Sequence, residues 1–156
     1  MKLAEALAER SAATRQVEQL RARVVGSARH QEGDTPPEDA SRLLAEADTV
    51  LVALESLIRR INRTNTTVRV EGIGTLTDAL ARRDVLRLRH SLLTSAADAA
   101  AGRDGNGPRR QLRSELLMLA ALPVAGLRAD ADALAKEIRH LDLRIQQANW
   151  EAELLD

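Results

Sequence analysis

The sequence contains no cysteine, which excludes disulfide bonds, a catalytic thiolate and metal sites with cysteine ligands. It also contains no phenylalanine and no tyrosine, and Trp150 is the only aromatic residue. A hydrophobic core must therefore be built from leucine, isoleucine, valine and alanine, which favours packing of helix against helix over a β-sandwich. We expect Trp150 to pack over one end of the helices, because it follows the last apolar position of its segment.

A surplus of charge is also absent, because 23 basic residues balance 23 acidic residues. Proteins that bind nucleic acid usually carry a basic surplus, together with aromatic side chains on which bases stack, so no nucleic-acid partner is expected. No uninterrupted apolar run approaches about 18 residues, and the segment from Met1 to Gln19 carries charges every few positions. We therefore expect no membrane partner, no signal peptide and a cytoplasmic location.

Apolar residues recur at helical spacing in four segments, which cover about residues 2–29, 36–63, 75–102 and 123–149. The most regular seam runs from Leu43 to Ile61 in alternating steps of four and three residues. The length of 156 residues fits a single helical domain over residues 1–156. We predict a mostly all-α fold of four long amphipathic helices, arranged in a bundle or as two antiparallel helix pairs.

The segment NTTVRVEGIGTLTD, between the second and third helices, is rich in β-branched residues and contains Gly72 and Gly74. It predicts a small β-hairpin; the alternative, a phosphate-binding loop, lacks the spacing and the lysine of a P-loop. Thr75 and Asp78 have the spacing of a capping box at the start of the third helix. Thr35 precedes Pro36 and is the predicted N-cap of the second helix. The clearest loop covers residues 102–110.

Three further stretches carry a resemblance: INRTN at 61–65, TLTDALARRDVLRLRHSLL at 75–93 and LDLRIQQANW at 141–150. With these motifs the chain resembles, over nearly its whole length, an uncharacterised and mainly actinobacterial family of helical proteins commonly labelled "septicolysin". The resemblance implies a helical fold and no established activity. The chain departs from the family pattern over Leu112–Leu122, where the sequences of the relatives are more typical of a strand. Helix and strand therefore both remain alternatives for this segment.

The family label also implies a pore-forming toxin, and the residues themselves argue against that role. The sequence predicts neither a secretion signal nor the belt of aromatic residues that anchors proteins at membrane interfaces. Membrane insertion is therefore the least favoured of the functional hypotheses.

Several charged residues fall on helix faces that ought to be apolar. At about 100° per residue, arginines lie at the centre of the apolar stripes of the first and third helices, near carboxylates that can pair with them. An unpaired buried charge is prohibitive, so this set predicts either a buried ion-pair layer or a pocket for a small anion such as phosphate or carboxylate. The candidate residues are Arg10, Arg21, Asp78, Arg82, Arg89 and Asp142.

Glu137 and His140 match one Glu-x-x-His element of di-metal helical bundles. Such a site needs a second element, which the sequence lacks, and His140 falls on the outer face of its helix. We therefore predict no metal site and no catalytic residues, and the sequence identifies no cofactor. The leading hypothesis is a non-enzymatic structural or interaction protein that forms a homo-oligomer, because long helices with heptad-like seams need further partners. The alternative is a binding protein or enzyme for a small anionic ligand that uses the arginine layer.

Overall fold

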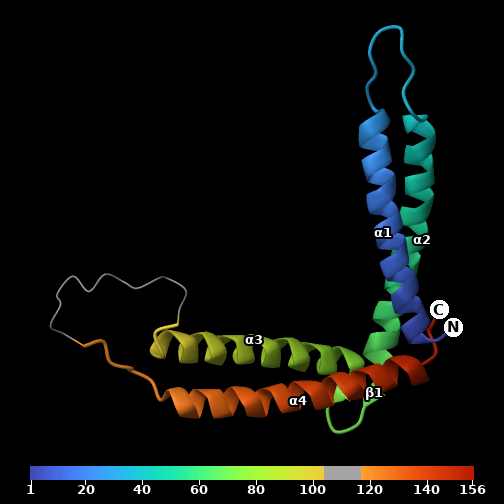
Figure 1. Ribbon diagram of the computed structural model, residues 1–156. Helices are drawn as coiled ribbons and strands as arrows, with labels where there is room; N and C mark the ends of the chain where they lie inside the picture. Colours follow the sequence, from blue (N-terminus) through green and yellow to red (C-terminus); the bar gives the residue numbers. More distant parts are fainter. Residues whose placement is uncertain (104–116) are drawn as a thin grey trace. The chain divides into compact units, whose positions relative to one another are not determined.

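The computed structural model describes residues 1–103 and 117–156 of the chain. Within these residues it contains four long α-helices and one two-stranded β-hairpin, which confirms the predicted mostly all-α fold and the position of the hairpin (Figure 1). The elements in chain order are α1 (Leu3–Ser27), α2 (Ala40–Thr67), β1 (Arg69–Val70), β2 (Gly74–Thr75), α3 (Leu76–Ala100) and α4 (Val124–Glu151). Most of the predicted loop at 102–110 lies outside the described residues. So do residues 112–116, while 117–122 are neither helix nor strand.

The chain divides into two compact units. The first contains Met1–Arg69 and Gln146–Asp156, and the second contains Val70–Ile145. The helix α4 therefore begins in the second unit and ends in the first. The single helical domain expected over residues 1–156 stays a prediction.

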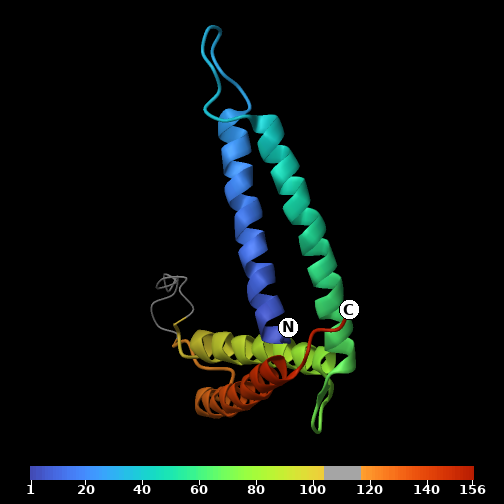
Figure 2. The ribbon, with the colours of Figure 1, turned by 90° about the vertical axis from the view of Figure 1, so that its right-hand side faces the viewer.

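In the first unit, α1 and α2 lie side by side and run in opposite directions (Figure 2). The predicted apolar seams hold this pair together, with Leu20 of α1 and Leu43 and Ile61 of α2 almost completely buried. The chain returns to this unit in the last turns of α4. There Lys2 and Glu153 form an antiparallel β-bridge, and the backbone N–H of Leu155 donates to the buried Thr64 hydroxyl at 3.0 Å.

In the second unit, α3 and α4 form the other antiparallel pair (Figure 1). Ion pairs join Asp98 to Arg128 and Arg87 to Asp142, each at 3.0 Å. Positions late in α3 thus meet positions early in α4, as antiparallel packing requires. The apolar layer between the two helices contains the buried residues Leu76, Ala79, Leu86 and Ala97 of α3 and Ala131, Leu141 and Ile145 of α4.

Hydrogen bonds between side chains and nearby backbone N–H groups determine where α2 and α3 begin. The predicted capping box of α3 is confirmed, because the Thr75 N–H donates to Asp78 Oδ2 at 2.7 Å and the Asp78 N–H donates to Thr75 Oγ1 at 3.2 Å. Gly74 has a φ of +136°, and a Cβ atom there would lie 2.5 Å from Asp78 Oδ2, so this turn requires glycine.

The predicted N-cap of α2 is wrong. The cap is Asp39, whose Oδ1 accepts the N–H groups of Ser41 at 3.0 Å and Arg42 at 3.1 Å. A second proline follows Pro36 and disfavours helical geometry at that residue, so the helix begins later, where a carboxylate can satisfy two free backbone donors.

Candidate functional site

The helix α3 carries two apolar stripes on opposite faces. One stripe contains the buried residues that pack in the α3/α4 pair, among them Leu86. The other contains Val85, Leu88 and Leu92, which are 62%, 72% and 68% exposed. Positions 86 and 88 lie about 200° apart around a helix, so the second stripe points away from α4. We call Val85, Leu88 and Leu92 the outer stripe.

The outer stripe has the spacing of a coiled-coil seam. Its three residues are separated by steps of three and four, so Val85 and Leu92 take heptad a positions and Leu88 takes a d position. The same spacing continues with exposed small side chains, Ala81 before the stripe and Ser95 and Ala99 after it. From Ala81 to Ala99 the face is about 27 Å long at about 1.5 Å per residue.

Charged residues flank the outer stripe on both sides. Asp84 takes the g position and Arg89 the e position, and both residues are exposed. Asp84 pairs with its neighbour Arg83 at 3.0 Å. Within residues 1–103 and 117–156, Arg89 has no carboxylate oxygen within 4.0 Å. The stripe is therefore apolar along its centre and carries opposite charges at its edges.

The arginines that were predicted to face the interior are exposed in the chain: Arg10 and Arg21 on α1, and Arg82 and Arg89 on α3. Their predicted burial is wrong, and on α3 the cause is physical. Because α3 has two apolar stripes on opposite faces, an average over all its apolar residues points between the stripes, where Arg82 and Arg89 lie. On α1 the seam includes Arg10, and its long side chain reaches solvent.

Four of the six candidates, Arg21, Asp78, Arg82 and Asp142, have separate partners. Arg82 pairs with Glu137 at 2.6 Å, and Asp142 pairs with Arg87 at 3.0 Å. Arg21 lies 3.7 Å from Glu18 on the same helix. Asp78 takes part in the capping box of α3. Arg10 and Arg21 belong to the first unit, and the other four candidates belong to the second. A ligand role for this set stays a prediction.

Two other sequence-derived hypotheses can be placed. Glu137 pairs with Arg82, and His140 is exposed, as its position on the outer face predicted. In the part of the chain that the structure describes, no group of three or more histidines and carboxylates is placed to hold a metal ion. Trp150 is 63% exposed, so the prediction that it packs over one end of the helices is wrong.

The outer stripe was missed as a separate feature, although its residues were recognised as helical. The sequence did contain a signal, because the apolar run at 76, 79, 86, 93 and 97 alternates with a separate run at 85, 88 and 92. Two apolar runs on opposite faces of one helix indicate a helix with partners on both sides.

Residues 10–154 match the family described as "Family of unknown function (DUF6847)". The chain belongs to this family. The family description assigns no activity and does not mention septicolysin.

A solved structure described as "a functionally unknown conserved protein from Corynebacterium diphtheriae" is similar to the chain over 99% of both sequences, with 39% identity and a TM-score of 0.90. No curated protein matches the chain. Among the residues described, no helix combines the length and the apolar character needed to cross a lipid bilayer.

Proposed function

We propose that the protein is a non-enzymatic interaction protein that self-associates by pairing the outer stripe of α3 with the outer stripe of a second copy. One observation carries this proposal. Three large apolar side chains at heptad spacing are exposed on the face of α3 that points away from α4. A helix that already buries one face in its own chain has no need of a second apolar face for folding, and such a face is typical of a helix with a further partner.

The energetics support a dimer of moderate affinity. Full burial of a valine or leucine side chain stabilises by about 1.5–3 kcal/mol, and a symmetric pair of outer stripes contributes six such side chains. Association costs about 4–15 kcal/mol in lost translational and rotational freedom. The two quantities have similar sizes, so the stripe favours a reversible dimer. Val at an a position with Leu at the following d position is also the combination that favours two-stranded coiled coils.

The flanking charges favour a parallel arrangement. In a parallel pair, a g residue faces the e residue five positions later on the partner helix, which places Asp84 of one copy beside Arg89 of the other. Symmetry forms this ion pair twice. In an antiparallel pair, e residues face e residues, so Arg89 would meet Arg82 with repulsion. The charge pattern therefore selects the parallel orientation.

The decisive experiment is the solution mass of the Leu88→Glu variant. Light scattering across a concentration series should give the wild-type protein about twice the chain mass of 17.0 kDa at high concentration. Leu88→Glu should return the mass of a single chain, because a buried glutamate in the stripe of each copy is strongly unfavourable.

The matched control is Leu143→Glu, because Leu143 is 68% exposed on α4 and lies outside the outer stripe. This variant should associate like the wild type. A wild-type mass of one chain at all concentrations would refute self-association. Equal dissociation by both variants would show that the contact is not specific to α3.

The second hypothesis, binding of a small anion by Arg10, Arg21, Arg82 and Arg89, gains no support from their placement. These arginines are exposed and are divided between α1 and α3.

A further inference from the structure

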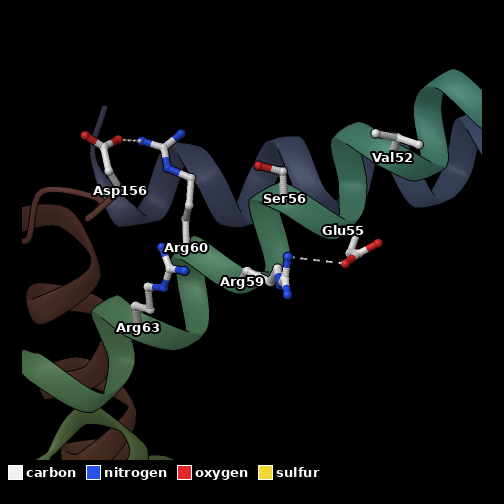
Figure 3. Close-up of a pocket in the computed structure, with 7 residues that line it drawn as sticks. All are labelled: Val52, Glu55, Ser56, Arg59, Arg60, Arg63 and Asp156. Carbon is white, nitrogen blue, oxygen red and sulfur yellow. Dashed lines mark hydrogen bonds and ion pairs between the residues drawn. The ribbon is translucent and has the colours of Figure 1, made fainter.

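Other arginines, on α2, line a cavity of about 500 Å³ in the first unit (Figure 3). Its lining residues are Val52, Glu55, Ser56, Arg59, Arg60, Arg63 and Asp156, and all except Asp156 come from α2. Ser56, Arg59 and Arg63 are separated by steps of three and four residues, so they lie on one face of the helix. A hydroxyl group and three guanidinium groups thus occur within about two helical turns.

Arg60 holds the best-defined position in this cavity. Its Nε donates to the backbone oxygen of Leu155 at 3.1 Å, and one terminal nitrogen donates to Asp156 Oδ1 at 2.9 Å. Its side chain is 31% exposed, whereas the side chain of Asp156 is fully exposed. The guanidinium is therefore positioned by the protein, while the carboxylate that it binds is free to leave.

The other two arginines are weakly paired. Arg59 lies 3.6 Å from Glu55, four residues earlier on the helix, and both side chains are about 70% exposed. Within residues 1–103 and 117–156, no carboxylate oxygen lies within 4.0 Å of Arg63. Three positive side chains thus face the side-chain carboxylates of Glu55 and Asp156.

We propose that this cavity binds a small phosphate-bearing anion, and that the anion displaces the Asp156 carboxylate from Arg60. Guanidinium groups match the geometry of phosphate oxygens and form strong charge-assisted hydrogen bonds with them. A phosphate group carries more charge than one carboxylate and can contact Arg60 and Arg63 together. The Ser56 hydroxyl supplies one further donor.

The lining also restricts the rest of the ligand. A volume of about 500 Å³ lies in the range of small-molecule sites. No aromatic residue lines the cavity, so a nucleobase would find no surface on which to stack. Val52 provides a small apolar contact at the edge. The chemistry fits pyrophosphate or a small phosphorylated metabolite.

The experiment is calorimetric titration with sodium pyrophosphate, at an ionic strength held constant with sodium chloride. Arg63→Ala should weaken binding by about tenfold, because it removes a charge-assisted contact. Asp156→Asn should strengthen binding by about threefold, because it removes the competing carboxylate. Arg15→Ala is the control, since Arg15 is an exposed arginine of α1 outside the cavity. It should bind like the wild type.

Opposite effects of Arg63→Ala and Asp156→Asn would support the site, because general loss of structure cannot strengthen binding. The helical content and melting temperature of each variant are measured alongside. Absence of pyrophosphate binding by the wild type would overturn the proposal, and so would equal loss in Arg15→Ala and Arg63→Ala. Malonate binding as tight as pyrophosphate binding would overturn the assignment to phosphate. None of these outcomes bears on self-association through α3.

Discussion

The helices α2 and α3 use one face in the same way and the opposite face differently. Each packs one apolar stripe against its antiparallel neighbour, with Ile61 of α2 and Leu86 of α3 buried. Opposite that stripe, α2 presents Ser56, Arg59 and Arg63, whereas α3 presents Val85, Leu88 and Leu92. The inner faces determine the fold. The outer faces are free to differ, and we propose that α2 meets a phosphate group there and α3 meets a second copy.

The contrast also shows why long paired helices suit an interaction protein. A helix pair covers only one face of each member, so most of the helix surface remains available. A mainly polar face, such as that of Ser56, Arg59 and Arg63 on α2, needs no partner in water. An apolar outer face does, so α3 is the element for which a partner is expected.

The largest expected effect contrasts an inner with an outer leucine. Leu20→Ala, at an α1 position that is 1% exposed, should lower the free energy of unfolding by about 2–5 kcal/mol at every protein concentration. Leu88→Ala should change it by less than about 0.5 kcal/mol in dilute protein, because Leu88 touches solvent in the single chain. Its cost should grow with concentration, since dimerisation stabilises the wild type by mass action.

Urea denaturation at several protein concentrations measures both variants. A large loss of stability for Leu88→Ala in dilute protein would mean that the outer stripe is covered within its own chain. The proposed partner for α3 would then be wrong.

The difference between α2 and α3 also explains why the sequence predicts the buried face of one helix and not of the other. On α2 the single seam from Leu43 to Ile61 repeats without interruption, so one period describes the helix and its buried face follows directly. On α3 two seams overlap, and any average over the helix falls between them. The helix itself was predicted correctly, because either seam alone has helical spacing. The side of the helix on which Arg82 and Arg89 lie was not predicted correctly.

Hydrogen bonds between residues that are close in the sequence could be predicted only where one spacing suffices to form them. The capping box of Thr75 and Asp78 was predictable because two residues at a fixed spacing suffice to form it. The N-cap at Asp39 was not, because Thr35 and Asp39 both have suitable side chains, and only the path of the chain after Pro36 and Pro37 decides between them. The cavity around Arg60 depends on Leu155 and Asp156, which lie about 95 residues away in the sequence. No local pattern indicates such a contact.

A smaller effect is expected from the charges beside the outer stripe. Arg89→Asp should weaken the dimer by about tenfold, because it replaces two attractive contacts with Asp84 of the partner by two repulsive ones. Adding Asp84→Arg should restore most of the affinity, because the exchanged charges attract again. Sedimentation equilibrium measures the three dissociation constants.

This experiment separates the two orientations. In an antiparallel pair Arg89 would lie near Arg82 of the partner, so Arg89→Asp would tighten the dimer instead. A tighter dimer would therefore refute the parallel arrangement and leave self-association itself intact.

The smallest expected effect tests the inner side of the comparison, where charge as well as apolar packing joins α1 to the segment that precedes α2. The Nε of Arg23 donates to Glu38 Oε2 at 2.9 Å, and a second bond joins the other carboxylate oxygen to the same guanidinium. The hydrogen bonds from Arg23 lower the pKa of Glu38 below its usual value of 4.5. A carboxyl group whose pKa is lowered in the folded state adds stability above its unfolded pKa, and this stability disappears as the pH falls through the folded value.

Glu38→Gln should therefore melt at a slightly lower temperature than the wild type at neutral pH. The difference in melting temperature should vanish once the pH falls below the lowered pKa of Glu38. Melting curves between neutral and acidic pH test this, with Glu9→Gln as the control, because Glu9 is an exposed α1 glutamate with no ion pair among the residues described. A difference between Glu38→Gln and wild type that persists at low pH would show that Glu38 contributes through packing and not through its charge.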